Sequence, residues 1–264
     1  MPTRLGVVSY FNTRPLVHAL ENGEIEHPFE LQFDVPSVCA DKLHRHETDV
    51  ALIPSIEIAR AAEPYAIAPG ASISSRGAVR SVLLVHNTDL SDIRTIALDT
   101  GSRTSVALSR IILHQVYGCN PETFPASPNL EHMLANADAA LIIGDAALEL
   151  DLDKYRCIDL GEAWTELTGL PFVYACWTGR EGALSNQHAE LLVRARTLGI
   201  SSIAAIADAH AASAPHSSEF YHRYLSQNIR YDLGEQECKG LELFYRYACE
   251  LNVIESVPKL TFFS

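Results

Sequence analysis

The chain passes from a strand into a helix at Ser9-Tyr10-Phe11-Asn12-Thr13-Arg14-Pro15-Leu16. The apolar residues 5–8 predict a short strand before this stretch, and apolar spacing after it predicts a helix whose first turn accommodates Pro15. Polar side chains therefore gather at the carboxyl end of a first strand, where open α/β sheets bind their ligands. The alternative is an ordinary turn capped by Thr13, and spacing alone leaves both interpretations open.

The composition limits the kinds of partner. The 264 residues are 47% hydrophobic and 20% charged, which is ordinary for globular proteins and argues against disorder. The net charge of −13 and the absence of a Lys/Arg-rich run argue against binding of nucleic acid. No segment approaches the roughly 18 consecutive apolar residues of a membrane span. A small molecule held by local donors remains as the expected ligand.

The amino terminus and the cysteines predict a cytoplasmic protein. The opening residues lead straight into a predicted strand of about five residues, which is too short for a secretory signal. The six cysteines, at positions 39, 119, 157, 176, 238 and 249, contain no C-x-x-C pair and are typical of reduced, mostly buried thiols.

Strands and helices alternate along most of the chain. A first α/β series has predicted strands at 5–8, 29–35, 49–55, 66–68 and 72–73 and helices at 37–43 and 56–60. A second series has strands at 78–85, 95–99, 139–143, 157–160 and 171–177 and a helix at 106–117. From residue 186 the pattern is helical, over 188–212, 219–225 and 235–251. The order predicts the α/β class.

This order also predicts two lobes. Residues 1–82 and 178–264 form a discontinuous first lobe that includes the helical carboxyl-terminal part, and residues 83–177 form an inserted second lobe. The apolar strands 78–85 and 171–177 would be the crossovers. Two lobes joined by two strands enclose a cleft that suits a small ligand.

Five polar strand ends are candidates to line that cleft. They comprise Ser9, Tyr10 and Asn12; Pro54 and Ser55; Ser81; Gly101, Ser102, Arg103, Thr104 and Ser105; and Gly144 and Asp145. The Gly101–Ser105 turn is the best anion site because it is rich in hydroxyls, opens a helix and offers Arg103 for a bidentate contact. The alternative is a helix capped by Thr104 or Ser105.

Motifs for other chemistry are missing. The sequence has no G-x-x-x-x-G-K, G-x-G-x-x-G, H-E-x-x-H or G-x-S-x-G, so we expect neither a metal nor a nicotinamide or flavin cofactor. Asp145 is either an acid or base or, more simply, a helix cap. Glu57 is predicted to be a structural surface or capping residue.

Several motifs together resemble the chorismate dehydratase (MqnA) family of the futalosine pathway to menaquinone. The match covers most of residues 4–180, and its most specific part is the opening stretch. The motifs are Ser9–Leu16, Ala51-Leu52-Ile53-Pro54-Ser55-Ile56-Glu57, Val79-Arg80-Ser81-Val82-Leu83-Leu84, Ser102-Arg103-Thr104-Ser105-Val106-Ala107-Leu108, Ile143-Gly144-Asp145-Ala146-Ala147-Leu148, Asp159-Leu160-Gly161-Glu162-Ala163-Trp164 and Thr168-Gly169-Leu170-Pro171-Phe172-Val173.

The resemblance implies a type II periplasmic-binding-protein-like fold in a cytosolic hydro-lyase. The enzyme would remove water from chorismate, a dicarboxylate, without cofactor or metal. The resemblance further implies that Asn12 is the polar catalytic residue and that Ser81, followed by Val82, lies near the reacting centre. An amide is no base near neutral pH, so Asn12 would orient or polarise, and a substrate carboxylate would take the proton.

Two other functions remain open at this point. One is the later enzyme of the same pathway, 1,4-dihydroxy-6-naphthoate synthase, and the other is a non-catalytic solute-binding protein for a small anion. The sequence leaves the oligomeric state open between monomer and homodimer.

Overall fold

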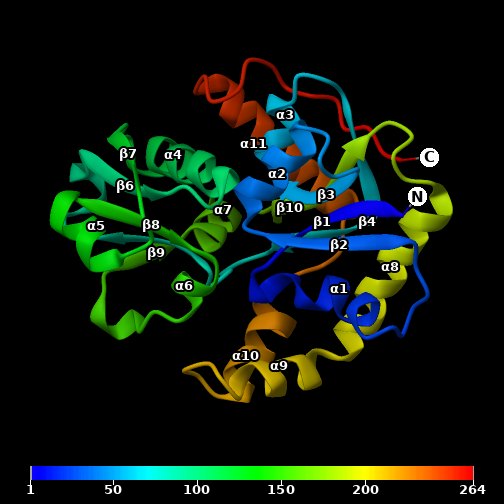
Figure 1. Ribbon diagram of the computed structural model, residues 1–264. Coiled ribbons are helices and arrows are strands. Elements are labelled where there is room, and N and C mark those ends of the chain that lie inside the picture. Colours follow the sequence, from blue (N-terminus) through cyan, green and yellow to red (C-terminus); the bar gives the residue numbers. More distant parts are fainter. Residues whose placement is uncertain (1, 264) are drawn as a thin grey trace.

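The computed structural model describes residues 2–263, which form two five-stranded sheets (Figure 1). Their strand orders are β2-β1-β3-β10-β4 and β7-β6-β8-β5-β9. In each sheet one strand, β10 or β5, runs antiparallel to its neighbours. The strands are β1 (Thr3–Val8), β2 (Phe29–Asp34), β3 (Val50–Pro54), β4 (Tyr65–Ser75), β5 (Val82–His86), β6 (Thr95–Asp99), β7 (Glu122–Ala126), β8 (Ala139–Ile143), β9 (Cys157–Asp159) and β10 (Phe172–Arg180).

Helices cover both sheets. Those formed by the last third of the chain pack mainly on the first lobe: α8 contacts α1 and β4, and α11 contacts β10. The α-helices are α1 (Arg14–Glu21), α2 (Pro36–His44), α3 (Ile56–Arg60), α4 (Arg103–Tyr117), α5 (Leu130–Asn136), α6 (Gly144–Leu148), α7 (Leu160–Thr168), α8 (Asn186–Ser201), α9 (Ile203–Ala211), α10 (Ser218–Arg223) and α11 (Glu235–Glu250). Shorter helical turns are η1 (Phe11–Thr13), η2 (Leu90–Asp92), η3 (Leu152–Lys154) and the π-helix η4 (Tyr224–Asn228).

The chain crosses between the sheets twice, and the strands at these points differ from the prediction. The strand predicted over 78–85 begins only at Val82, because Arg80 adopts a left-handed conformation with φ 68°. From Phe172 onward β10 pairs with β4 and then also with β3. Residues 172–177 therefore belong to the first sheet rather than to the inserted lobe, and we propose lobe boundaries near 81/82 and 171/172.

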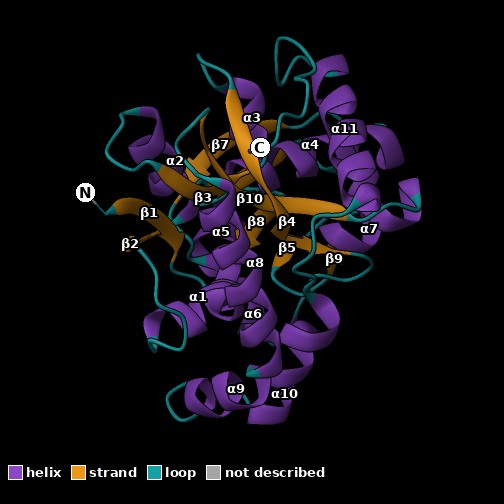
Figure 2. Ribbon diagram, turned by 90° about the vertical axis from the view of Figure 1, so that its right-hand side faces the viewer, coloured by secondary structure: helices purple, strands orange, loops and turns teal. Residues whose placement is uncertain are grey.

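Several predicted elements differ in detail. The two short strands predicted around Gly70 are one strand, β4, in which that glycine has φ 77°. The long helix predicted over 188–212 divides at Ser202 into α8 and α9. The helices α9 and α10 project beyond both sheets in the two views (Figures 1 and 2). Strand β7 and helices α5 and α7 had not been predicted as elements.

Candidate functional site

A cavity lies between the lobes, at the carboxyl ends of β1, β3, β6 and β8. Tyr10 follows β1, Pro54 ends β3, Ser102 follows β6 and Gly144 follows β8. Parallel strands of a sheet end at the same edge, so the two sheets present these turns to each other. The space between the walls, including the open mouth, is about 490 Å³.

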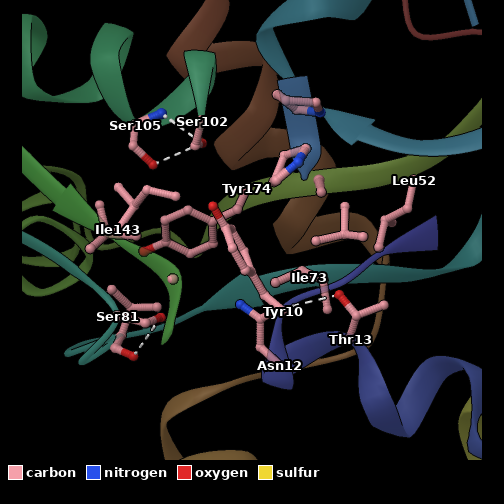
Figure 3. A pocket seen from close by; sticks show the side chains of 17 residues that line it. Tyr10, Asn12, Thr13, Leu52, Ile73, Ser81, Ser102, Ser105, Ile143 and Tyr174 are labelled. Atoms are coloured by element: carbon pink, nitrogen blue, oxygen red, sulfur yellow. Dashed lines mark hydrogen bonds between the residues drawn. The ribbon is translucent and has the colours of Figure 1, made fainter. Parts of the chain in front are cut away.

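Hydroxyl and amide groups form the polar part of the lining, as Figure 3 shows. Asn12 and Thr13 come from the turn after β1, and the Thr13 hydroxyl donates to Asn12 Oδ1 at 3.3 Å. Ser81 immediately precedes β5 and is 1% exposed. Tyr174 lies on β10, and its hydroxyl shares a 3.0 Å hydrogen bond with Ser75. Groups from the first lobe and from the segment that joins β4 to β5 therefore converge on one space.

The amino-terminal end of α4 supplies a further polar edge. Ser102 caps this helix, and its Oγ accepts from the Ser105 N–H at 3.4 Å. The hydroxyls of the two serines lie 3.0 Å apart. A helix amino terminus carries free N–H groups and a partial positive charge, which suit an anion. The cap is thus Ser102 rather than Thr104 or Ser105.

Tyr10 lies against Gly101 and Gly144 and leaves no room for a side chain at either position. A Cβ on Gly101 would lie 2.9 Å from the Tyr10 hydroxyl, and one on Gly144 would lie 2.8 Å from its ring. Gly144 also has φ 64°, which disfavours a side chain. The aromatic ring from the first lobe therefore packs directly on the backbone of the second lobe.

No charged side chain lines the cavity within residues 2–263. Burial raises the pKa of the phenols of Tyr10 and Tyr174, so both stay protonated at neutral pH and can donate hydrogen bonds. An anion in this space would meet hydroxyls, one amide and helix amino termini instead of a cation.

Arg103 does not line the cavity, contrary to its predicted role as an anion contact. Its guanidinium donates to Glu57 Oε2 at 2.9 Å and to Asp41 Oδ1 at 2.8 Å. The predicted surface position of Glu57 was also wrong, because this side chain is 5% exposed. Since α4 belongs to the second lobe and α2 and α3 to the first, the ion pairs join the lobes.

Ser55 and Thr104 also join the lobes rather than lining the cavity. The Ser55 hydroxyl donates to the Val173 carbonyl at 2.8 Å. The Thr104 hydroxyl accepts from the Ile56 N–H at 3.1 Å. Both side chains are fully buried, so they hold the strand end and the helix in place.

Asp145, at the start of α6 in the second lobe, contacts the opening stretch Ser9–Leu16 of the first lobe. Its Oδ1 accepts from the Phe11 N–H at 2.9 Å. Burial raises the pKa of this carboxyl group, although the hydrogen bond from Phe11 favours the charged form. Ser9 is exposed, and its N–H donates to the Asp34 carbonyl. Neither Ser9 nor Asp145 lines the cavity.

Eight predicted residues therefore line the cavity, and six lie outside it. Those that line it are Tyr10, Asn12, Pro54, Ser81, Val82, Ser102, Ser105 and Gly144, whereas Ser9, Ser55, Gly101, Arg103, Thr104 and Asp145 do not. The lining residues missing from the prediction are Val8, Thr13, Pro36, Leu52, Ile73, Val79, Ile143, Tyr174 and Ala175. Of these, Thr13 lay within the opening stretch, and Tyr174 and Ala175 lay on a predicted crossover strand.

Residues 2–263 contain no group of three or more His, Cys, Asp or Glu side chains placed to hold a metal ion. Among the helices of the same residues, none has the length and apolarity to span a membrane.

The sequence matches a family model described as menaquinone biosynthesis over residues 3–250. A chorismate dehydratase of Thermus thermophilus is 29% identical over 261 residues, which cover 92% of this chain and 94% of the relative. A chorismate dehydratase of Campylobacter jejuni is 31% identical over 175 residues, 64% of each chain.

Solved structures show the same fold. A protein from Archaeoglobus fulgidus aligns with a TM-score of 0.77 at 19% identity, covering 95% of this chain and 98% of that one. The periplasmic aliphatic sulphonate binding protein of Escherichia coli aligns with a TM-score of 0.62 at 16% identity, covering 97% of this chain and 94% of its own. The fold is therefore the two-lobed, periplasmic-binding-protein-like α/β fold that the sequence predicted.

Proposed function

This chain belongs to the menaquinone biosynthesis family, and on that premise we propose that it is a chorismate dehydratase. The reaction converts chorismate to 3-(1-carboxyvinyloxy)benzoate and water. We place it in the futalosine pathway and in the cytoplasm, and we propose that the chain needs no cofactor. The names of the two bacterial relatives support the reaction, and the cavity supports the mechanism below.

The observation that carries the mechanism is a cavity between the lobes whose lining, within residues 2–263, places hydroxyls and one amide among apolar residues and holds no charged side chain. Chorismate has two carboxylates, which the hydroxyls and the amino-terminal end of α4 can bind through neutral donors. A cation would hold a carboxylate in its charged form and lower its pKa, which weakens it as a base. Neutral donors perturb the pKa less and leave a substrate carboxylate able to accept a proton.

We assign the proton transfer to that substrate carboxylate. The carboxylate takes the ring proton, the electrons of the C–H bond form the new ring double bond, and the C–O bond to the ring hydroxyl breaks. The departing hydroxide and the proton together make the water that is released. Aromatisation of the ring drives the step. The protein orients the substrate and excludes bulk water.

Asn12 and Ser81 are the side chains to which we assign catalytic roles. Both line the cavity, and Asn12 is fixed by the hydrogen bond from Thr13. The Asn12 amide donates hydrogen bonds that orient or polarise the substrate. The Ser81 hydroxyl contacts the reacting part of the ring.

The test is turnover of chorismate by purified protein with no added cofactor, followed by liquid chromatography and mass spectrometry. We expect loss of one water, and we expect Asn12→Ala and Asn12→Asp to reduce kcat strongly. The Asp variant would place a carboxylate against a dianion, which at about 4 Å and an effective dielectric of about 20 costs about 4 kcal/mol.

Asn22→Asp is the matched control, because Asn22 is exposed at the far end of α1 and its replacement by Asp adds the same charge. We expect wild-type turnover from this variant. Wild-type turnover by Asn12→Asp at saturating chorismate would refute the role of Asn12. Binding of chorismate without turnover would favour a solute-binding protein, and turnover only of a cyclic futalosine derivative would favour 1,4-dihydroxy-6-naphthoate synthase.

A further inference from the structure

A tyrosine from the carboxyl-terminal helices reaches the proposed catalytic serine. The Tyr224 hydroxyl donates a 2.8 Å hydrogen bond to Ser81 Oγ, and the tyrosine is 2% exposed. The phenol therefore contacts one of the two side chains to which the mechanism assigns catalytic roles, although Tyr224 itself is not part of the cavity lining.

The direction of the hydrogen bond determines what Ser81 can do. Burial raises the pKa of the Tyr224 phenol, so it stays protonated and donates. A serine hydroxyl has one hydrogen to donate and two lone pairs. The phenol occupies one lone pair, so the serine hydrogen must point elsewhere. The acceptor nearest to this hydrogen within the protein is the Val79 carbonyl at 3.5 Å, which is the limit of a hydrogen bond, and the other direction open to it is the cavity.

The fold holds Tyr224 in this position from two sides. The residue begins the π-helix η4, a rare conformation that widens a helical turn and frequently occurs at functional sites. At the other end of the same turn, Asn228 Nδ2 donates to the Ala78 carbonyl at 2.8 Å. The tyrosine ring also stacks against Phe11, with ring centroids 6.2 Å apart. The π-helix is thereby tied both to the segment before Ser81 and to the opening stretch.

We propose that Tyr224 is a positioning residue, which donates to Ser81 so that the serine hydroxyl presents its hydrogen to the substrate. In the dehydration, that hydrogen bond stabilises the oxygen as the C–O bond breaks. The inference rests on the proposed function. It assigns to the carboxyl-terminal helices a part in catalysis, whereas the sequence had suggested only a helical part of the first lobe.

The test is the isosteric variant Tyr224→Phe, which removes one hydroxyl and keeps the ring. Because the lost hydrogen bond acts in the transition state, we expect kcat to fall at least about tenfold with KM within about threefold of wild type. Tyr221→Phe is the matched control. Tyr221 is also buried, but within residues 2–263 its hydroxyl accepts only from the backbone N–H of His216, at 3.4 Å, so we expect kcat to be unchanged.

A double variant separates positioning from a structural role. If Tyr224 acts through Ser81, Tyr224→Phe has no further effect on kcat in a Ser81→Ala background. Independent, multiplicative losses would overturn the inference, as would wild-type kcat in Tyr224→Phe. Should Tyr224→Phe fail to fold, Asn228→Ala loosens the same turn and must lower kcat, and wild-type kcat there would overturn the inference.

The wild-type reaction distinguishes the two levels of the proposal. Wild-type turnover of chorismate with normal Tyr224→Phe kinetics refutes the role of Tyr224 and leaves the proposed function standing. Absence of wild-type turnover refutes the proposed function and, with it, the role of Tyr224.

Discussion

Replacement of Arg103 by methionine distinguishes an interlobe ion pair from a substrate ligand. Arg103 lies at the start of α4, and its guanidinium contacts the carboxylates of Glu57 and Asp41 in the first lobe. The sequence had predicted that the same guanidinium binds the anionic ligand. The structure favours the interlobe role, because the side chain does not line the cavity.

The size of the effect follows from burial. Glu57 is 5% exposed and Arg103 is 31% exposed. Breaking a fully buried pair costs about 3–5 kcal/mol, whereas exposed pairs contribute about 0.2–1 kcal/mol. Glu57 keeps His44 and Arg60 as partners, at 3.2 and 3.3 Å. We therefore expect Arg103→Met to cost about 2 kcal/mol, which lowers Tm by roughly 4–8 °C for a chain of this size.

A double-mutant cycle with Glu57→Gln provides the assay. Calorimetry gives Tm, and steady-state kinetics with chorismate give kcat/KM, for wild type, both single variants and the double variant. For an interlobe pair we expect KM to rise by no more than about 30-fold, the equivalent of about 2 kcal/mol. In the Glu57→Gln background, Arg103→Met should then lower Tm less than it does in wild type, because only the pair with Asp41 remains to be lost.

A substrate ligand would behave differently in the same cycle. Arg103→Met would leave Tm of the free protein near wild type and would raise KM equally with or without Glu57. That result would refute the interlobe role and restore the prediction made from the sequence.

Three further predictions follow from buried groups. The pKa of Glu57 lies below its usual value of 4.5, because burial, which raises it, is outweighed by His44 and Arg103. Its stabilising contribution is therefore present above about pH 4.5 and is lost as the pH falls through the lower folded-state pKa, so Tm should fall less between pH 5 and 3 in Glu57→Gln than in wild type. Asp159 accepts from four backbone N–H groups, two of them in the turn before Ser81, so Asp159→Asn should cost about 2 kcal/mol in thermal unfolding and lower kcat; a normal kcat would contradict the link to Ser81. A Cβ on Gly199 would lie 1.7 Å from the Pro15 carbonyl oxygen, so Gly199→Ala should cost about 3 kcal/mol by calorimetry, and a wild-type Tm would show that α1 and α8 can separate.

The sequence was sufficient to predict several of the strand ends that line the cavity. Tyr10, Pro54, Ser102 and Gly144 each follow a strand or end one, and the parallel topology brings such positions to one edge. Such strand ends can be predicted locally, because polar residues directly after an apolar run can be read from the sequence. Their catalytic or binding roles remain predictions.

Contacts between distant segments could not be predicted in the same way. Arg103 beside two serines and a threonine suggests an anion site, and nothing near it in the chain shows that Glu57 lies 2.9 Å away. Tyr224 lies 143 residues from Ser81 in an ordinary helical pattern. Strand β7 was missed because it is a partly exposed edge strand that contains Pro125, and these features weaken a strand pattern.

The position of the arginines has a consequence for the chemistry. Arg60 and Arg103 both pair with Glu57, so their charges are held at the junction of the lobes and away from the cavity. An arginine in the cavity would bind a dicarboxylate more strongly but would lower the pKa of the carboxylate that must remove the ring proton. Only interactions that are stronger in the transition state than in the ground state accelerate a reaction. On the proposed mechanism, Glu57 therefore serves catalysis as well as stability, because it keeps Arg103 away from the substrate.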